Sequence, residues 1–219
     1  MRGMTVRAAW TTLAILLTVT VTFAQPGGRL SGTPASELRI VVDELQVAAA
    51  RANAPDTLST RAGWLHDSVF RPPDWKGPVT NPDEVTRDYA RSLQLAAELI
   101  RQNPPKQVLA DIAADLETKV EHCQRLGIGM GGVVRVRVNT RRGGDIVRNL
   151  QVRYLLKFYE YIKGAQPGTF PQFSSPTEET LSPGRYWMWT FDPATGRETT
   201  RTLVKVAGQR EMVVDVPVT

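Results

Sequence analysis

The chain has 219 residues, 27 basic and 22 acidic side chains, a formal net charge of +5 at pH 7 and one cysteine. A lone cysteine, Cys123, excludes an internal disulfide, so burial of apolar side chains must hold the fold together. A chain of this length can bury enough apolar surface to do so. The only histidines are His66 and His122, so a zinc site or a Ser-His-Asp arrangement would have to use one of them.

The N-terminus has the three parts of an export signal. Two arginines precede an apolar stretch over residues 8–23, and Ala24 offers a small residue for cleavage. An uncleaved membrane anchor is the alternative, but a spanning helix needs about 20 apolar residues, and this stretch is shorter and interrupted by threonines. We therefore expect a signal peptide over residues 1–24 and an exported, periplasmic or extracellular protein. Contact with a membrane is expected only if the signal is retained.

Apolar residues then recur at helical spacing, after a flexible linker predicted at residues 25–33. The three helical stretches span residues 38–52, 85–100 and 109–123. Pro34 and Pro82 suit the first turn of a helix, and the Pro104-Pro105 pair separates the last two stretches. This short break predicts an antiparallel hairpin of two helices, covered by the first helix. We expect a helical domain over residues 34–127.

The hydrophobic period changes to two after a glycine-rich segment at residues 128–132. This segment has the glycine content of a phosphate loop, but it joins a helix to a strand and lacks the following Gly-Lys-Ser/Thr, so we interpret it as a hinge. The stretches with strand character span residues 134–139, 150–158, 177–181, 185–191, 198–206 and 212–218. They predict an antiparallel β-sandwich over residues 133–219. The expected fold class is therefore α+β, a helical hairpin or three-helix unit followed by a sandwich.

One turn between these strands carries a recognisable motif. Leu181-Ser182-Pro183-Gly184-Arg185-Tyr186 leads into an aromatic strand, and a valine-rich strand, residues 213–218, comes last. In these features, residues 132–219 resemble the carboxypeptidase regulatory-like domains, which share a small transthyretin-like sandwich and an L-x-P-G-x-Y turn. The resemblance implies an accessory domain that supports folding, anchoring or partner binding, and it implies no catalytic residue. It does not extend to the helical part.

Positive charge is concentrated in residues 132–160, where seven basic side chains stand against two acidic ones. Arg135, Arg137 and Arg153 alternate with apolar residues along two predicted strands. They are candidates for a basic face that attracts an anionic partner, and the alternative is an ordinary solvated strand face.

The aromatic strand places Trp187, Trp189 and Phe191 on a common face. If this row is exposed, it can stack on sugar rings, so Trp187 and Trp189 are candidate binding residues. We expect the row to be buried instead, in which case Tyr186 and Met188 face outward.

A second candidate site lies in a proline-rich connection between the first two predicted helices. It contains Trp64, His66, Asp67, Asp74 and Trp75, and loops often carry functional residues. A hydrolase-like site is one interpretation, and tryptophans that pin the loop to the helices are the other.

The remaining histidine and the cysteine are adjacent on a predicted helix. Cys123 falls on the apolar stripe, which predicts a buried position, and His122 is then expected to flank it on the surface, since neighbouring side chains on a helix diverge by about 100°.

These features favour a non-enzymatic binding or adaptor protein that acts on a protein, or on an anionic envelope polymer or carbohydrate, through its sandwich. The sequence carries no assembled catalytic set and no motif for a metal or cofactor. Export and the lack of a recognisable binding module argue against nucleic acid. The alternatives are a hydrolase-like enzyme in the Trp64–Trp75 connection and a purely structural envelope component.

Overall fold

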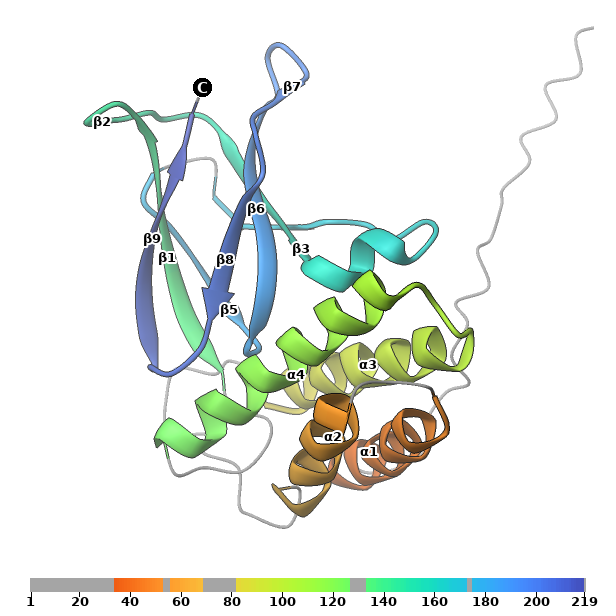
Figure 1. The fold of residues 1–219 in the computed structure, drawn as a ribbon. Coiled ribbons are helices and arrows are strands. Elements are labelled where there is room, and N and C mark those ends of the chain that lie inside the picture. The colour runs from red at the N-terminus through yellow and green to blue at the C-terminus, as the bar shows by residue number, and fades with distance from the viewer. Residues whose placement is uncertain (1–33, 53–55, 69–81, 127–132, 173–174, 219) are drawn as a thin grey trace, which may run out of the picture. The chain divides into compact units, whose positions relative to one another are not determined.

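The computed structural model describes five stretches of the chain: residues 34–52, 56–68, 82–126, 133–172 and 175–218. The expected signal peptide, linker and glycine hinge lie outside the described residues. Residues 31–219 form one compact unit. Helices occupy its N-terminal part and two β-sheets its C-terminal part, so the α+β fold class is confirmed (Figure 1).

Four helices make up the N-terminal part: α1 Pro34–Arg51, α2 Asp56–Ser68, α3 Pro82–Arg101 and α4 Lys106–Leu126. Pro34 and Pro82 are the first residues of α1 and α3, where a missing backbone N–H costs nothing. Asn103 has a φ of 51°, a left-handed conformation that terminates α3 before the two prolines. α1 packs along α3, and α2 contacts both α1 and α4. None of the described helices is both long and apolar enough to span a membrane.

Helix α2 corrects the expectation of a loop around Trp64. Leu58, Ala62 and Leu65 recur at helical spacing and are fully buried, which explains why this segment folds as a helix against its neighbours. The stripe is only three residues long and is set among serine, threonine and arginine, so its period is easily missed. His66 and Asp67 therefore lie on a helix.

Sheet A has β1 at its centre. Strand β9 pairs with β1 in parallel, whereas β5 and the short β2 pair with it antiparallel. Its strands are β1 Val134–Arg142, β2 Asp145–Ile146, β5 Thr177–Leu181 and β9 Glu211–Pro217. Alternation along β1 buries Val134, Val136 and Val138 and turns the residues between them outward.

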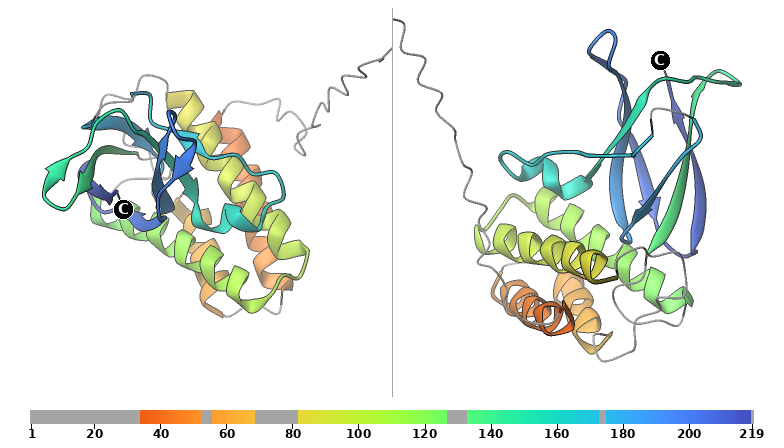
Figure 2. Two further views of the ribbon diagram at one scale, coloured as in Figure 1. Left: turned by 90° about the horizontal axis from the view of Figure 1, so that it is seen from above. Right: turned by 180° about the vertical axis from the view of Figure 1, so that it is seen from behind.

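Sheet B is antiparallel throughout the described strands, with β6 between β3 and β8. Its strands are β3 Gln151–Leu156, β4 Gly168–Thr169, β6 Gly184–Asp192, β7 Arg197–Glu198 and β8 Thr202–Val206. The strand expected to reach residue 158 ends at Leu156, and a 3-10 helix, η1 (Lys157–Tyr161), follows it. The two sheets face each other as a sandwich (Figure 2).

The helices and the sandwich share one apolar cluster. α4 contacts both β6 and η1, and buried residues of all four helices and both sheets belong to the same cluster. The helices thus provide a base to which the sandwich is fixed through α4.

The two faces of β6 are the reverse of our expectation. Tyr186 and Met188 are buried in the sandwich core, and the face of Trp187 and Phe191 points outward and is partly exposed. Trp189 shares that outer face but is nevertheless buried. Large apolar residues occupy both faces of β6, so alternation alone does not show which face is inside.

Candidate binding surfaces

The outer face of sheet A is a ladder of paired charges. Arg135 faces Glu211 across the β1–β9 pairing, with Nη1 and Oε1 3.2 Å apart. On the other side of β1, Arg137 forms an ion pair with Glu178 of β5. We call this surface the charge ladder, and it consists of Arg135, Arg137, Asn139, Arg141, Glu178, Glu211 and Asp215.

At the far end of the charge ladder, Asp215 is held by two neighbours. Arg141 Nε lies 3.1 Å from Asp215 Oδ1, and Asn139 Nδ2 donates to the same oxygen at 2.9 Å. These hydrogen bonds, from Asn139 first and then Arg141, hold the pKa of Asp215 below its usual value. Asp215 therefore keeps its negative charge at neutral pH, and acidic and basic side chains alternate across the strands of the ladder.

The three candidate arginines do not share one surface. Arg135 and Arg137 lie on the charge ladder, whereas Arg153 belongs to β3 of sheet B. There Arg153 Nη1 lies 2.9 Å from Glu198 Oε1, and its guanidinium lies 3.8 Å from the Phe191 ring centroid. Each of the three has an acidic partner, so the positive charge of these three arginines is locally neutralised.

An exposed valine interrupts the charge ladder. Val213 of β9 is directly opposite Arg137 in the strand register, and its side chain is 64% exposed. The charged side chains around it are exposed, so a partner that binds here can also bury the apolar surface of Val213.

The outer face of sheet B carries the aromatic row, with a cation over each ring. Lys157 Nζ lies 4.9 Å from Trp187, and the Arg201 guanidinium lies 4.5 Å from Trp189. Phe191 has Arg153 above it, as described. These cation–π contacts occupy the ring faces that a sugar would need, so stacking on Trp187 or Trp189 requires displacement of a charged side chain.

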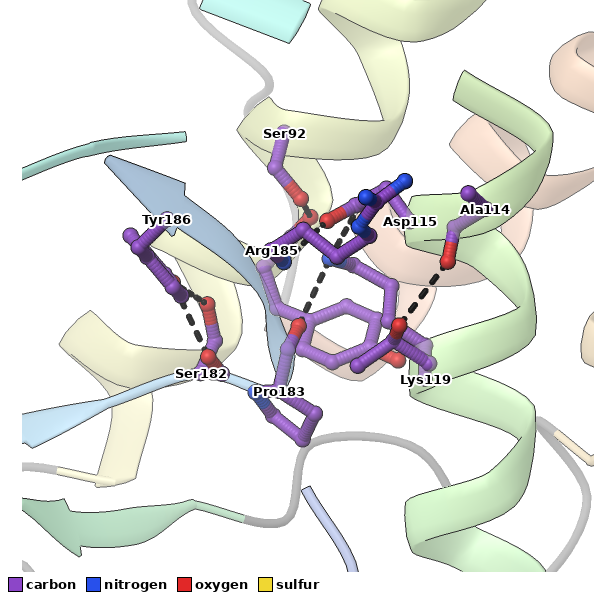
Figure 3. A network of polar contacts seen from close by, with 10 residues as sticks. Ser92, Ala114, Asp115, Lys119, Ser182, Pro183, Arg185 and Tyr186 are labelled. Carbon is purple, nitrogen blue, oxygen red and sulfur yellow. Dashed lines mark hydrogen bonds and ion pairs between the residues drawn. The ribbon is translucent and has the colours of Figure 1, made fainter. Parts of the chain in front are cut away.

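A fully buried ion pair joins α4 to the turn that precedes β6 (Figure 3). Lys119 Nζ lies 2.7 Å from Asp115 Oδ2, and the two side chains are 0% and 1% exposed. Lys119 Nζ also donates to the Pro183 carbonyl oxygen at 2.7 Å, and the Arg185 backbone N–H donates to Asp115 Oδ1 at 2.9 Å. The Tyr89 ring of α3 lies 5.3 Å from the ammonium. These partners compensate the buried charges and fix the sandwich to the helices.

The same turn contains the L-x-P-G-x-Y motif, and the packing explains its residues. A Cβ at Gly184 would lie 2.8 Å from both Asp115 Oδ1 and Leu156 Cδ2, so only glycine fits against the ion pair. The Tyr186 hydroxyl donates to the Ser182 carbonyl oxygen at 2.9 Å and closes the turn. The motif residues thus serve architecture. The sequence signal that could have indicated this ion pair is the spacing of Asp115 and Lys119, which are four residues apart beside the apolar stripe of α4.

His122 is buried, which corrects the expectation that it lies on the surface. The Gly208 backbone N–H donates to His122 Nδ1 at 3.1 Å, so the turn between β8 and β9 covers this part of α4. Burial lowers the pKa of His122 to about 4, and the imidazole is therefore neutral at physiological pH. Cys123 is buried, as predicted.

A further polar cluster attaches η1 to α4. Asp111 accepts a hydrogen bond from the Tyr161 hydroxyl at 2.8 Å and lies 3.5 Å from Lys157 Nζ. Lys157 also pairs with Glu160, which accepts a hydrogen bond from Trp187 Nε1 at 3.0 Å. Both carboxylates are paired within the cluster, and the cluster fixes η1 to α4.

The residues of the Trp64–Trp75 connection are only partly described. Trp64 is partly buried and packs against the apolar cluster, and His66 and Asp67 follow it on α2. Asp74 and Trp75 lie outside the described residues, so a site that combines all five remains a prediction. Within the described stretches, no group of three or more His, Cys, Asp or Glu residues is placed to hold a metal ion.

Comparison of the chain with protein-family models, curated proteins and solved structures finds no match. The resemblance of residues 132–219 to carboxypeptidase regulatory-like domains therefore remains a prediction from the motif.

Proposed function

We propose that this protein is an exported, non-enzymatic binding or adaptor protein, and that another protein docks on the charge ladder. The observation that carries the proposal is the alternation of exposed, paired charges around exposed Val213. Export rests on the pattern of residues 1–24. In this proposal the helices serve as the base that holds the sandwich.

The pairing of the ladder favours a protein over an anionic polymer as the partner. A polyanion approaching Arg135 or Arg137 also meets Glu211 or Glu178, so the net attraction is small. A protein that presents both signs can exchange these pairs for intermolecular ones and bury Val213 at the same time. Such complementarity gives specificity and steers association.

The size of the ladder indicates an exchangeable contact. β1, β9 and β5 have nine, seven and five residues, and at about 3.3 Å per residue and about 4.8 Å between strands the face measures roughly 330 Å². A stable interface buries about 800 Å² on each partner. The ladder alone is thus less than half of that, which suits an adaptor that binds and releases.

Site-specific photo-crosslinking in the full chain, produced in its own cell, tests the proposal. We expect a crosslinker at Val213 to form one discrete adduct with another protein. A crosslinker at Leu203, an exposed apolar residue of β8 in sheet B, is the matched control and should form none. The adduct should weaken as salt is raised, because exposed charges are screened.

A charge exchange then links the adduct to the ladder. Arg137→Glu combined with Glu178→Arg keeps an ion pair at this position but reverses its order, so folding is retained while recognition is lost. We expect at least a tenfold loss of the Val213 adduct. An undiminished adduct, or none from the original chain, contradicts the proposal. An adduct between two copies of this chain would instead indicate a structural envelope component.

A further inference from the structure

Strand β9 forms an open edge of sheet A. It pairs with β1 on one side, and none of the described strands pairs with its other side. In Figure 1, β9 lies at the outer margin of the sandwich, next to β1. Such an edge offers a row of backbone hydrogen-bonding groups to which an extended peptide can be added as a further strand.

The hydrogen bonds to β1 show which backbone groups of β9 point to the open edge. The Arg135 N–H donates to the Arg210 carbonyl oxygen at 2.8 Å, and the Val218 N–H donates to the Arg141 carbonyl oxygen at 2.6 Å. Neighbouring residues of a strand direct their backbone groups to opposite sides, so the even-numbered residues from 210 to 218 bond to β1. The residues between them direct their backbone groups to the open edge, and they are Glu211, Val213, Asp215 and Pro217.

Pro217 limits this edge at one end. Proline has no N–H, and at an outward-facing position this costs no bond to β1, which is why proline is tolerated in edge strands. Glu211, Val213 and Asp215 are left with both an outward N–H and an outward carbonyl oxygen. A short antiparallel segment opposite these three residues would form about six backbone hydrogen bonds.

The side chains of the same three residues define the partner. Glu211, Val213 and Asp215 are all exposed on the outer face of sheet A, with the valine between the two acids. The charge of the ladder changes sign from strand to strand, negative on β5, positive on β1 and negative on β9. An added strand with basic side chains opposite Glu211 and Asp215 continues this order, because cross-strand pairs of opposite charge are stabilising.

Both carboxylates can accept from a further cation. Arg135 is paired with Oε1 of Glu211, and Arg141 and Asn139 both contact Oδ1 of Asp215, so these bonds use one oxygen of each carboxylate. The Glu211 and Asp215 side chains are 68% and 56% exposed. An ionised carboxylate has about four acceptor sites on its two oxygens. A basic side chain of an added strand therefore does not have to displace the arginines of β1.

A second copy of this chain fits the edge poorly. In the antiparallel register that uses all three outward N–H groups of both copies, Glu211 of one copy lies opposite Asp215 of the other. Like charges that are directly opposite destabilise a strand pair. The edge thus favours a different protein, whose segment carries two basic residues four positions apart.

We propose that β9 binds an extended segment of its partner as an added antiparallel strand, with two basic side chains opposite Glu211 and Asp215 and an apolar one opposite Val213. The inference rests on the proposed docking function and names the part of the partner that binds. The segment has the pattern basic–x–apolar–x–basic, in which each x faces the other side of the sheet. Its backbone hydrogen bonds add to the small area of the charge ladder.

Titration of the full chain with the peptide acetyl-Thr-Lys-Thr-Val-Thr-Lys-Thr-amide, followed by NMR, tests the proposal. We expect saturable shifts of the Glu211, Val213 and Asp215 amide signals, and slower hydrogen exchange of these amides because they become hydrogen-bonded. A peptide with glutamate in place of both lysines is the control for charge and should bind about tenfold more weakly. Equal binding of the two peptides would overturn the assignment to a basic segment.

Methylation of the peptide backbone separates strand addition from attraction by charge alone. N-methylation of the central valine removes a donor that faces β9, and we expect it to weaken binding about tenfold or more. N-methylation of the threonine that follows the valine alters an N–H that faces away from β9. This peptide is the matched control, and its affinity should stay within about twofold of the parent peptide.

Two results would overturn the strand addition: equal effects of the two methylations, or no saturable shift with the parent peptide. Neither affects the docking proposal, which the Val213 adduct in the cell tests separately. An adduct that forms although the peptide does not bind would mean that the partner docks through its folded surface. Protection of the three amides that appears without peptide and increases with protein concentration would show that a second copy occupies the edge, and would also overturn the proposal.

Discussion

The buried pair Asp115–Lys119 and the pairs of the charge ladder use the same chemistry in opposite surroundings. At the contact between α4 and the turn before β6, which we call the junction, both charges are removed from water. Each of them also forms a hydrogen bond with a backbone group. On the ladder the paired side chains are between 36% and 68% exposed. Loss of one partner leaves an uncompensated charge in the first case and a solvated one in the second. The comparison indicates that the junction fixes architecture, whereas the ladder can exchange partners at little cost.

The largest effect should follow from breaking the buried pair. Asp115→Ala leaves the Lys119 ammonium buried without its counter-ion, and we expect the free energy of unfolding to fall by about 3–5 kcal/mol. Urea unfolding at pH 7 measures this change. Asp215→Ala, on the exposed ladder, is the control and should cost much less, because water screens the charges that remain. Similar losses for the two variants would contradict the distinction between junction and ladder.

The next effect is a pH dependence of the free energy of unfolding, which arises from His122 where α4 meets the turn between β8 and β9. The pKa of His122 is lowered to about 4 in the folded state, against about 6.5 in an unfolded chain. The unfolded state therefore binds the proton first, so this contribution is complete above pH 6.5 and is lost as pH falls toward 4. The loss amounts to about 3 kcal/mol, from a shift of about 2.5 pKa units.

Comparison with His122→Gln isolates this contribution from that of the carboxylates. We expect the native chain to be the more stable protein at pH 7, and its advantage to shrink between pH 6.5 and pH 4. Urea unfolding of both proteins at several pH values measures the difference. An advantage that is independent of pH would show that His122 does not titrate in this way.

The smallest effect should come from the ladder. A double-mutant cycle on Arg137→Ala and Glu178→Ala should give a coupling energy of about 0.2–1 kcal/mol, which decreases as salt is added. Thermal or urea unfolding of the four proteins measures it. A coupling above about 2 kcal/mol would mean that the ladder is a structural element, and would weaken its proposed role in docking.

The sequence was sufficient for the fold class because the two hydrophobic periods are long and separate. The starts of α1 and α3 coincide with Pro34 and Pro82, and β6 begins within the turn motif, at Gly184. Helix α2 was missed because its stripe contains only Leu58, Ala62 and Leu65. Short stripes in polar surroundings acquire helical structure from their packing partners rather than from their own period.

The candidate surfaces were less accessible to sequence reasoning because they depend on pairing between distant strands. Arg135 and Glu211 are 76 positions apart, and nothing local to either residue indicates that they meet. His122 was misplaced for the same reason, since the turn that covers it contains Gly208 and belongs to the last strands. The alternation of apolar and polar residues along a strand shows which side chains share a face. Only the assembled sheets show which other residues cover that face.

The parallel pairing of β9 with β1 has a consequence for the growing chain. β1 leaves the ribosome first, and its partner on one edge is made about 76 residues later. At about 5–20 residues per second, this edge waits roughly 4–15 seconds with its backbone hydrogen-bonding groups unpaired. Its alternating valines make it a template for wrong strand pairing during that time. The topology therefore leaves one edge of β1 open to wrong pairing over this interval, and a chaperone or delayed folding would protect it.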